Sequence, residues 1–251
     1  MQKYVCFGRG VTMPRFFMEP PISDPVVITG EDARHIALSL RMKVGDTLTL
    51  CDGEGKDYTC LIDSIDASQV IANITETIPS ATEPSVFVTL YQGVPKSDKF
   101  ETVVQKAVEL GVSAIVPVMM SRCVSRPDAK SMEKKVQRWQ KIAESAAKQS
   151  GRGIVPQVRA CMDYNKALAV AKGTKILFYE CGGISLTEMI DSNMQEISVF
   201  IGPEGGISGQ EYEAAIASGA KASTLGPRIL RTETAPLAAL TAIMLLTGNM
   251  E

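Results

Sequence analysis

The chain has 251 residues, 45% of them hydrophobic, and can therefore bury one large core or two modest ones. Its formal net charge of −2 excludes a strong overall attraction to nucleic acid or anionic membranes, so a polyanion would have to bind at a local basic patch. The six cysteines form no C-x-x-C pair, which excludes the usual zinc spacings, and a histidine-based triad would have to use the single histidine, His35.

Residues 1–12 carry Lys3 and Arg9 on either side of one short apolar patch and lack the long apolar stretch of a secretory signal. A second start, Met13, follows them. We therefore interpret residues 1–12 as a leader, either non-native or a misassigned start, that belongs to neither predicted domain.

Residues 13–82 show mainly the alternation of apolar and polar side chains that is typical of β-strands. Asp52-Gly-Glu-Gly55 has the composition of a hairpin connection. We predict a small β-barrel-like domain, which ends at the proline-bounded linker Pro79–Pro84. Its predicted elements are a helix over Glu31–Leu40 and strands over Thr47–Cys51, Tyr58–Ile65 and Val70–Thr77.

Residues 83–251 alternate between strand and helix patterns, which is typical of a mostly parallel sheet with helices on both faces. Apolar residues repeat at helical spacing between Asp98 and Gly111, so Asp98 is predicted to cap this helix. We predict a single α/β domain over this range. Its predicted strands are Val86–Tyr91, Ala114–Val118, Val155–Val158, Lys175–Tyr179, Ile197–Ile201 and Ala222–Leu225, and the later helices begin near Ser131, Tyr164, Ser185, Ser208 and Thr234.

Three glycine-bearing loops each connect a predicted strand to a predicted helix. In an open parallel sheet, the loops at the carboxyl ends of the strands form the ligand crevice, so three of them favour one small-molecule site walled by backbone. The spacing of Ile201–Gly206 matches neither a Walker loop nor G-x-G-x-x-G, and a tight turn without a ligand stays open for this loop taken alone. The loops are Tyr179–Gly183, Ile201–Gly206 and Leu225–Ala235.

The third loop places Arg228 and Arg231 between a strand and a helix for which Thr234 is the predicted N-cap and Pro236 lies in the first turn. Arginines beside a helix N-terminus suit an anionic group, although two solvated loop charges would look the same in sequence. The carboxylates nearest the loops are Glu204, Glu211 and Glu233.

The helix from Ser131 has a basic side opposite an apolar stripe that includes Trp139. This pattern fits either a surface that contacts RNA phosphates or an ordinary solvated helix face. The basic residues in and around the helix are Arg122, Arg126, Lys130, Lys134, Lys135, Arg138, Lys141, Lys148 and Arg152.

The last predicted helix, Leu237–Leu246, is apolar on nearly every face, so we expect it to be buried either in the monomer core or between the sheet and a second subunit. It is shorter than the ~20 residues that span a bilayer, and we expect no membrane partner. The scattered cysteines are typical of a protein of the reducing cytoplasm.

Several motifs together resemble the RsmE-type ribosomal RNA uridine-N3 methyltransferases of the SPOUT class. The resemblance runs from Met13 to the C-terminus, and the last two motifs are together the most specific. One departure is Lys148, where relatives more often carry an acid. The motifs are Met13-Pro-Arg-Phe-Phe17, Arg41 with Gly45-Asp46, Gln105–Gly111, Gln149-Ser-Gly-Arg152, Ile201–Gly206 and Leu225–Ala235.

The resemblance implies a PUA-like RNA-binding β-barrel over residues 13–82 and a SPOUT-type α/β domain with a parallel sheet and a deep trefoil knot over residues 83–251. It also implies a homodimer that transfers a methyl group from S-adenosyl-L-methionine to N3 of a uridine in the 16S ribosomal RNA of the small subunit. No metal is required. The implied cofactor contacts are Tyr179, Gly202, Gly205, Gly206, Leu225, Gly226, Ile229, Leu230 and Arg231.

The reaction must orient the uridine and remove its N3 proton. Arg231 or Arg152 could stabilise the negative charge that spreads to the uracil oxygens. Glu233 or Glu204 is a candidate general base, and proton transfer to solvent is the alternative. The residues predicted to contact RNA are Arg15, His35, Arg41, Arg122, Lys134, Arg138 and Lys148.

Two other classes remain open from the residues alone. One is a doubly wound enzyme that binds an adenine nucleotide and acts on a small molecule. The other is an RNA-binding or assembly factor without catalysis. Binding of S-adenosylmethionine separates the first from the methyltransferase prediction, and methyl transfer separates the second.

Overall fold

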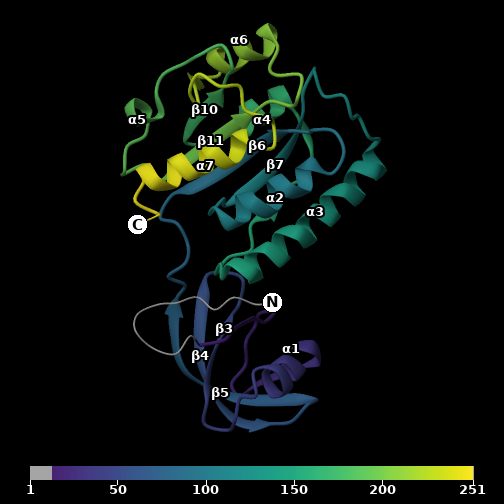
Figure 1. Ribbon diagram of the computed structural model, residues 1–251, viewed down its shortest axis with the longest axis vertical. Helices are drawn as coiled ribbons and strands as arrows, with labels where there is room; N and C mark the ends of the chain where they lie inside the picture. The colour runs from purple at the N-terminus through teal and green to yellow at the C-terminus, as the bar shows by residue number, and fades with distance from the viewer. Residues whose placement is uncertain (1–12, 251) are drawn as a thin grey trace. The chain divides into compact units, whose positions relative to one another are not determined.

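The computed structural model describes residues 13–250, so the predicted leader, residues 1–12, lies outside the described residues (Figure 1). Of the described chain, one compact unit (unit 1) contains the residues up to Glu83 together with Ala147–Val155. The other (unit 2) contains Pro84–Ala146 and the residues from Pro156 onward. The predicted two-domain division did not include the contribution of Ala147–Val155 to the first unit.

Unit 1 is built on a five-stranded sheet with the strand order β1-β3-β4-β5-β2. Strand β1 runs parallel to β3, and the other neighbouring strands are antiparallel. All three strands predicted here are present, each within two residues of its predicted bounds. The strands are β1 (Arg15–Phe17), β2 (Val26–Thr29), β3 (Thr47–Cys51), β4 (Lys56–Ile65) and β5 (Gln69–Pro79).

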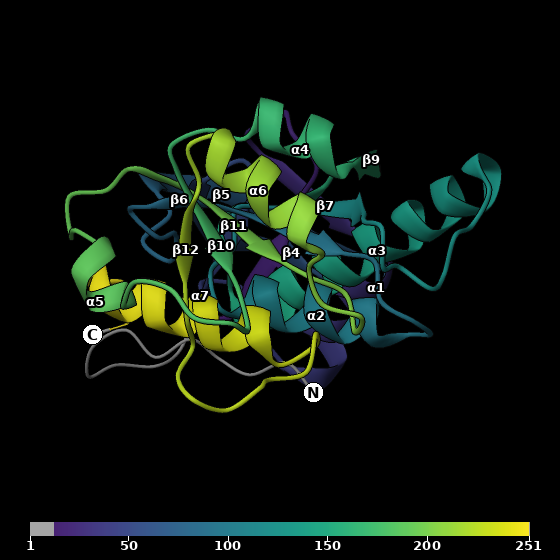
Figure 2. The ribbon, with the colours of Figure 1, turned by 90° about the horizontal axis from the view of Figure 1, so that it is seen from above.

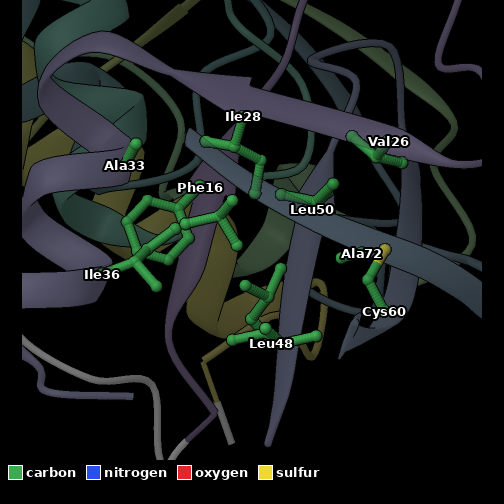
Figure 3. Close-up of a cluster of buried hydrophobic side chains, with 11 residues drawn as sticks. Phe16, Val26, Ile28, Ala33, Ile36, Leu48, Leu50, Cys60 and Ala72 are labelled. Carbon is green, nitrogen blue, oxygen red and sulfur yellow. The ribbon is translucent and has the colours of Figure 1, made fainter. Parts of the chain in front are cut away.

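The core of unit 1 forms where alternate strand residues turn to the same face, such as Leu48 and Leu50 of β3 (Figure 3). The single helix predicted over Glu31–Leu40 is instead a short α-helix, α1 (Gly30–Arg34), followed by a π-helical turn, η1 (His35–Ser39). Ala33 of α1 and Ile36 of η1 both lie in the core, and Figure 3 shows both beside Phe16. Arg41, which follows this turn, has a positive φ of 54°.

The segment Ala147–Val155 is part of unit 1 because its backbone pairs with the β3–β4 hairpin. The N–H of Gly55 donates to the carbonyl of Gly153 over 3.0 Å, and the N–H of Val155 donates to the carbonyl of Gly53 over 3.1 Å. These bonds join residues about 100 positions apart in sequence, which no local pattern could indicate.

Unit 2 contains a seven-stranded sheet with the order β12-β10-β11-β6-β7-β8, and β9 also pairs with β7. Every pair of neighbouring strands is parallel, as the alternation of strands and helices predicted. The strands are β6 (Phe87–Gly93), β7 (Ala114–Met119), β8 (Gln157–Val158), β9 (Met162–Asp163), β10 (Thr174–Phe178), β11 (Glu196–Ile201) and β12 (Lys221–Ser223).

Helices cover both faces of this sheet, with α2 and α7 on one side and α4 and α6 on the other (Figure 2). Trp139 of α3 is buried and stacks on Phe100 of α2 with the ring centroids 4.1 Å apart, as expected for a core residue. The helices are α2 (Lys99–Glu109), α3 (Ala129–Ser150), α4 (Tyr164–Val170), α5 (Leu186–Met189), α6 (Gly209–Ala217) and α7 (Ala235–Leu246).

The predicted helix caps form only in part. Ser208 caps α6 through a reciprocal capping box with Glu211. Asp98 and Thr234 occupy the N-cap positions of α2 and α7, as predicted, but the side chain of neither makes a capping hydrogen bond. At α7 the backbone N–H of Ala235 instead donates to the carbonyl of Arg231 over 2.9 Å, because the preceding loop already turns helically.

Within residues 13–250, no group of three or more histidine, cysteine or carboxylate side chains is arranged to hold a metal ion. No helix in the same range has the length and apolar character that crossing a membrane requires.

Candidate active site

A cavity of about 930 Å³ opens in unit 2 at the carboxyl ends of β10, β11 and β12. Its walls are the three glycine-bearing loops and Lys99, the first residue of α2. The crevice therefore lies where the parallel-sheet rule places it. Every residue predicted to contact the cofactor lines this cavity, namely Tyr179, Gly202, Gly205, Gly206, Leu225, Gly226, Ile229, Leu230 and Arg231.

Two glycines shape the loop that follows β11. Gly206 has a φ of +71°, which side-chain-bearing residues rarely adopt, and a Cβ there would meet the carboxylate of Glu180. A Cβ on Gly205 would lie 2.8 Å from the Cβ of Arg122. The loop can run this close to its neighbours only because both positions lack a side chain.

Arg122 holds the same loop from outside. Its guanidinium donates to the carbonyl of Gly205 over 3.0 Å and to that of Ile207 over 3.3 Å. This arginine was predicted to contact RNA, and the structure instead brings its side chain against the loop that walls the cavity. It does not itself line the cavity.

A buried hydrogen-bond network joins the second and third loops. The amide nitrogen of Gln92, at the end of β6, donates to the hydroxyl oxygen of Thr232 over 3.0 Å. That hydroxyl donates in turn to the carbonyl of Gly202 over 2.8 Å. Because Gln92 and Thr232 are both buried, these bonds are shielded from competition with water and fix the spacing of the loops.

Lys99 joins the same two loops through charge. Its ammonium lies 3.2 Å from a carboxylate oxygen of Glu204 and 3.1 Å from one of Glu233. Burial pushes the pKa of Glu233 upward, but its own backbone N–H and Lys99 outweigh burial and hold that pKa below its ordinary value. The hydrogen bond to Glu233 is the main cause that raises the pKa of Lys99. Near neutral pH an ionised Glu233 therefore lies beside a protonated Lys99.

Apolar and positively charged side chains also line the cavity. Ile229 is 85% exposed and lines the cavity, so a ligand could cover a large apolar side chain there. Arg228 and Arg231 are exposed and also line it. The ring of Tyr179 stacks on Tyr212 of α6 with a centroid separation of 4.6 Å, which fixes the first loop against that helix.

Of the four candidate catalytic residues, the structure brings three together. Arg231 and Glu204 line the cavity, and Glu233 reaches Glu204 through Lys99. Arg152 lies in unit 1 and does not line the cavity. Its side chain is 5% exposed and is paired with Glu83, with the shortest nitrogen–oxygen distance 2.6 Å.

Apart from Arg122, the residues predicted to contact RNA fall into two groups of three. Three of them contact another side chain. Arg15 forms an ion pair with Asp57 at 2.6 Å, and Arg138 forms one with Glu101 at 2.9 Å. The ring of His35 packs edge-on against Phe16. The other group is exposed to solvent and comprises Arg41, Lys134 and Lys148, with the ammonium of Lys148 also lying 5.9 Å from the ring of Phe17.

Lys99, Gln92 and Thr232 were not among the predicted site residues. Gln92 is the next-to-last residue of β6, and Lys99 begins the helix after it, so both flank a fourth strand-to-helix connection at the same edge of the sheet. The parallel-sheet rule applied to that connection could have indicated them. It has no glycine cluster, the pattern on which the prediction of the other three loops depended.

The chain matches two family models. Residues 82–244 match an RNA methyltransferase domain, and residues 28–75 match the PUA domain of RNA methyltransferases.

Similar proteins cover nearly the whole chain. A ribosomal RNA small subunit methyltransferase E of Bacillus subtilis is 37% identical over 225 residues, which cover 86% of this chain and 88% of the relative. Another protein of that name, from Mesomycoplasma hyopneumoniae, is 32% identical over 91% of this chain and 98% of its own length. The crystal structure of a ribosomal RNA small subunit methyltransferase E of Neisseria gonorrhoeae bound to S-adenosyl methionine is 36% identical, with a TM-score of 0.79 over 93% of this chain and 98% of that one.

Proposed function

The chain belongs to the RNA methyltransferase family, and from this we propose that it transfers a methyl group from S-adenosyl-L-methionine to N3 of a uridine in the 16S ribosomal RNA of the small subunit. The observation that carries the proposal is the glycine-walled cavity at the carboxyl edge of the parallel sheet. It lies within the matched methyltransferase domain and contains all nine predicted cofactor contacts.

The cavity fits S-adenosylmethionine in size and chemistry. Its volume of about 930 Å³ is at the upper end of the range of small-molecule sites. The glycines expose backbone groups that can hydrogen-bond an adenine or ribose, while Ile229 and Leu230 offer apolar surface. Glu180 and Glu204 place carboxylates in the wall, where they can offset the charge of a cationic sulfonium. Lys99, Arg228 and Arg231 in the same wall suit the carboxylate of the cofactor.

When bound, the cofactor supplies a methyl group already activated by the sulfonium. The chain's own residues must hold the acceptor nitrogen in line and exclude water. Arg231 is the arginine placed to stabilise negative charge on the uracil oxygens, since Arg152 is occupied by Glu83. Glu233 and Glu204 remain the candidates to accept the N3 proton. The lowered pKa keeps Glu233 ionised but makes it a weak base, so release of the proton to water is the alternative route.

The substrate contact proposed for unit 1 and for helix α3 is with the RNA backbone. Arg41, Lys134 and Lys148 are exposed cations of the kind that contact phosphates. Arg41 belongs to the segment matched by the PUA family model. Arg138 would contribute only by leaving Glu101, and Arg15 only by leaving Asp57.

The proposed assembly is a homodimer, for which α7 is the candidate interface. Its inner residues, including Leu240 and Ile243, are fully buried, but Leu245 is 58% exposed and Thr241 is also exposed. Such an apolar helix with one uncovered face suits a second subunit. The proposed location is the cytoplasm, supported by the scattered cysteines.

The proposed fold of unit 2 includes a deep trefoil knot in the loops after β11 and β12. The hydrogen bond between Thr232 and Gly202 supports it, because it places the third loop directly against the second. Threaded chains are rare in proteins, which counts against a knot.

Calorimetric titration tests the proposed cofactor. S-adenosylmethionine should bind, whereas ATP and NAD should bind much more weakly or not at all. Preferential binding of ATP or NAD would instead support the adenine-nucleotide enzyme. Gly206→Trp, which fills the cavity loop, should retain RNA binding and lose methyl transfer. If the wild-type protein binds RNA but transfers no methyl group, the result would support the alternative of an RNA-binding or assembly factor without catalysis.

A further inference from the structure

Lys99, Glu204 and Glu233 form an ion-paired cluster. Neither of the candidate roles in methyl transfer, proton acceptance and charge stabilisation, is assigned to Lys99. We propose that Lys99 is a positioning residue, which locks the two principal cofactor loops to each other through Glu204 and Glu233 before the cofactor binds. The inference rests on the proposed function for the identity of the cofactor. The loop locking itself does not depend on any ligand.

The geometry places one cation between three chain segments. Glu204 belongs to the loop Ile201–Gly206, Glu233 belongs to the loop Leu225–Ala235, and Lys99 opens α2. A single ammonium within 3.2 Å of both carboxylates therefore ties three segments at one point. The backbone N–H of Lys96 also donates to the two oxygens of Glu204, over 3.1 and 3.3 Å, so this loop is attached both to α2 and to the segment before it.

The charges explain why a cation is needed there. Two carboxylates that share one partner must lie close to each other, and like charges at such separations repel. Their side chains are 26% and 24% exposed, so water screens them only in part. Without Lys99, the repulsion would favour separation of the two loops.

The position of Lys99 in its own helix supports a role outside it. Lys99 is the first residue of α2, where the helix dipole disfavours a cation and favours an acid. Local helix chemistry therefore gives no reason for a lysine at this position. Lys106 on the same helix shows the ordinary arrangement, a basic residue in the last turn that pairs with Glu109 at 2.9 Å.

Lys99→Met tests the inference, with Lys106→Met as the matched control because it removes another ion-paired lysine of α2 that does not line the cavity. In the protein without cofactor, Lys99→Met should speed amide hydrogen exchange in residues 201–206 and 225–235, and Lys106→Met should not. S-adenosylmethionine should bind Lys99→Met about tenfold more weakly. Lys99→Arg should restore most of both properties, since it keeps the charge.

A variant that lacks both carboxylates separates a positioning role of Lys99 from direct contact between Lys99 and the cofactor. In Glu204→Gln/Glu233→Gln, the additional Lys99→Met change should have little further effect on affinity, because Lys99 acts through the two carboxylates. An undiminished effect there would overturn the positioning role, as would exchange and affinity in Lys99→Met that equal those of Lys106→Met. If the wild-type protein does not bind S-adenosylmethionine, the proposed cofactor fails, while the exchange measurement still decides whether Lys99 locks the loops. Unchanged thermal unfolding of Lys99→Met would show that the fold is retained.

Discussion

The hydroxyl of Thr232 donates a 2.8 Å hydrogen bond to the carbonyl of Gly202 and accepts one from the amide of Gln92. One small side chain thereby joins the loop after β11, the loop after β12 and the end of β6. The cavity is thus assembled from segments that are distant in sequence, and its shape depends on a few buried polar contacts.

Thr232→Val keeps the side-chain volume and removes the hydroxyl. It should cost about 1–2 kcal/mol of unfolding free energy, because the Gln92 amide and the Gly202 carbonyl lose a partner. It should also weaken S-adenosylmethionine binding about fivefold. Urea unfolding and calorimetry measure the two effects.

Thr247→Val is the matched control, because Thr247 is as buried as Thr232 and its hydroxyl also donates to a carbonyl, that of Ile243 at the end of α7. It should lose stability without losing affinity. Equal losses of affinity in the two variants would show that the Thr232 bridge has no special part in the cavity.

Gly205→Ala introduces a Cβ that would lie 2.8 Å from the Cβ of Arg122 and 3.1 Å from its carbonyl oxygen. Because one of these atoms belongs to the backbone, the loop itself must move. We expect S-adenosylmethionine affinity to fall about tenfold. Gly209→Ala is the control, since no atom lies within 4 Å of its added Cβ and α6 begins there. It should leave affinity unchanged and keep or slightly raise the melting temperature. Normal binding by Gly205→Ala would argue against a rigid loop.

The order of elements and the location of the site could be predicted because both depend on local sequence. Alternating strands and helices gave the parallel sheet, and the glycines after β10, β11 and β12 gave three walls of the cavity. The contacts that hold these walls could not be predicted. Lys99, Gln92 and Arg122 act on residues about 80 to 140 positions away, and no periodicity records such pairings.

Arg152 is a second residue whose role depends on a distant contact that the sequence does not indicate. As part of the motif Gln149–Arg152 it was a candidate for catalysis, but the deciding contact is with Glu83, 69 residues earlier. The same carboxylate also accepts from the N–H groups of Gly153 and Ile154, so it organises the whole turn. Charge alone could not tell a catalytic arginine from one that anchors a segment.

Arg152→Met should therefore act on stability. Removing one partner of a buried pair leaves the Glu83 carboxylate without its cation and should cost about 3–5 kcal/mol in urea unfolding. Arg138→Met removes an arginine whose side chain is 64% exposed and should cost less than about 1 kcal/mol. A fully stable Arg152→Met protein that lost methyl transfer would return Arg152 to the catalytic candidates.

Glu211 should give the protein part of its acid sensitivity. Its buried carboxylate accepts from the N–H of Ser121 over 2.7 Å and from the N–H of Ser208 over 2.9 Å. Burial raises the pKa of Glu211, but these hydrogen bonds outweigh burial and hold it below its ordinary value of 4.5. The stabilisation is therefore complete above about pH 4.5 and is lost as the pH falls through the lower folded-state pKa.

Glu211→Gln should consequently lower the unfolding free energy at pH 7 by about 1–3 kcal/mol, and the difference from wild type should shrink below pH 4. The exposed Glu213 of the same helix provides the control, since Glu213→Gln should change stability little at either pH. A difference for Glu211→Gln that is constant down to pH 3 would contradict the assigned role of its carboxylate.

Mass-spectrometric mapping of small-subunit ribosomal RNA from cells with and without this protein tests whether the chain methylates N3 of one uridine. When the protein is absent, one uridine should lack a single N3 methyl group, and supplying the wild-type chain should restore it whereas Gly206→Trp should not. Identical methylation of the RNA in both cells, or a missing methyl group on another base or atom, would contradict it.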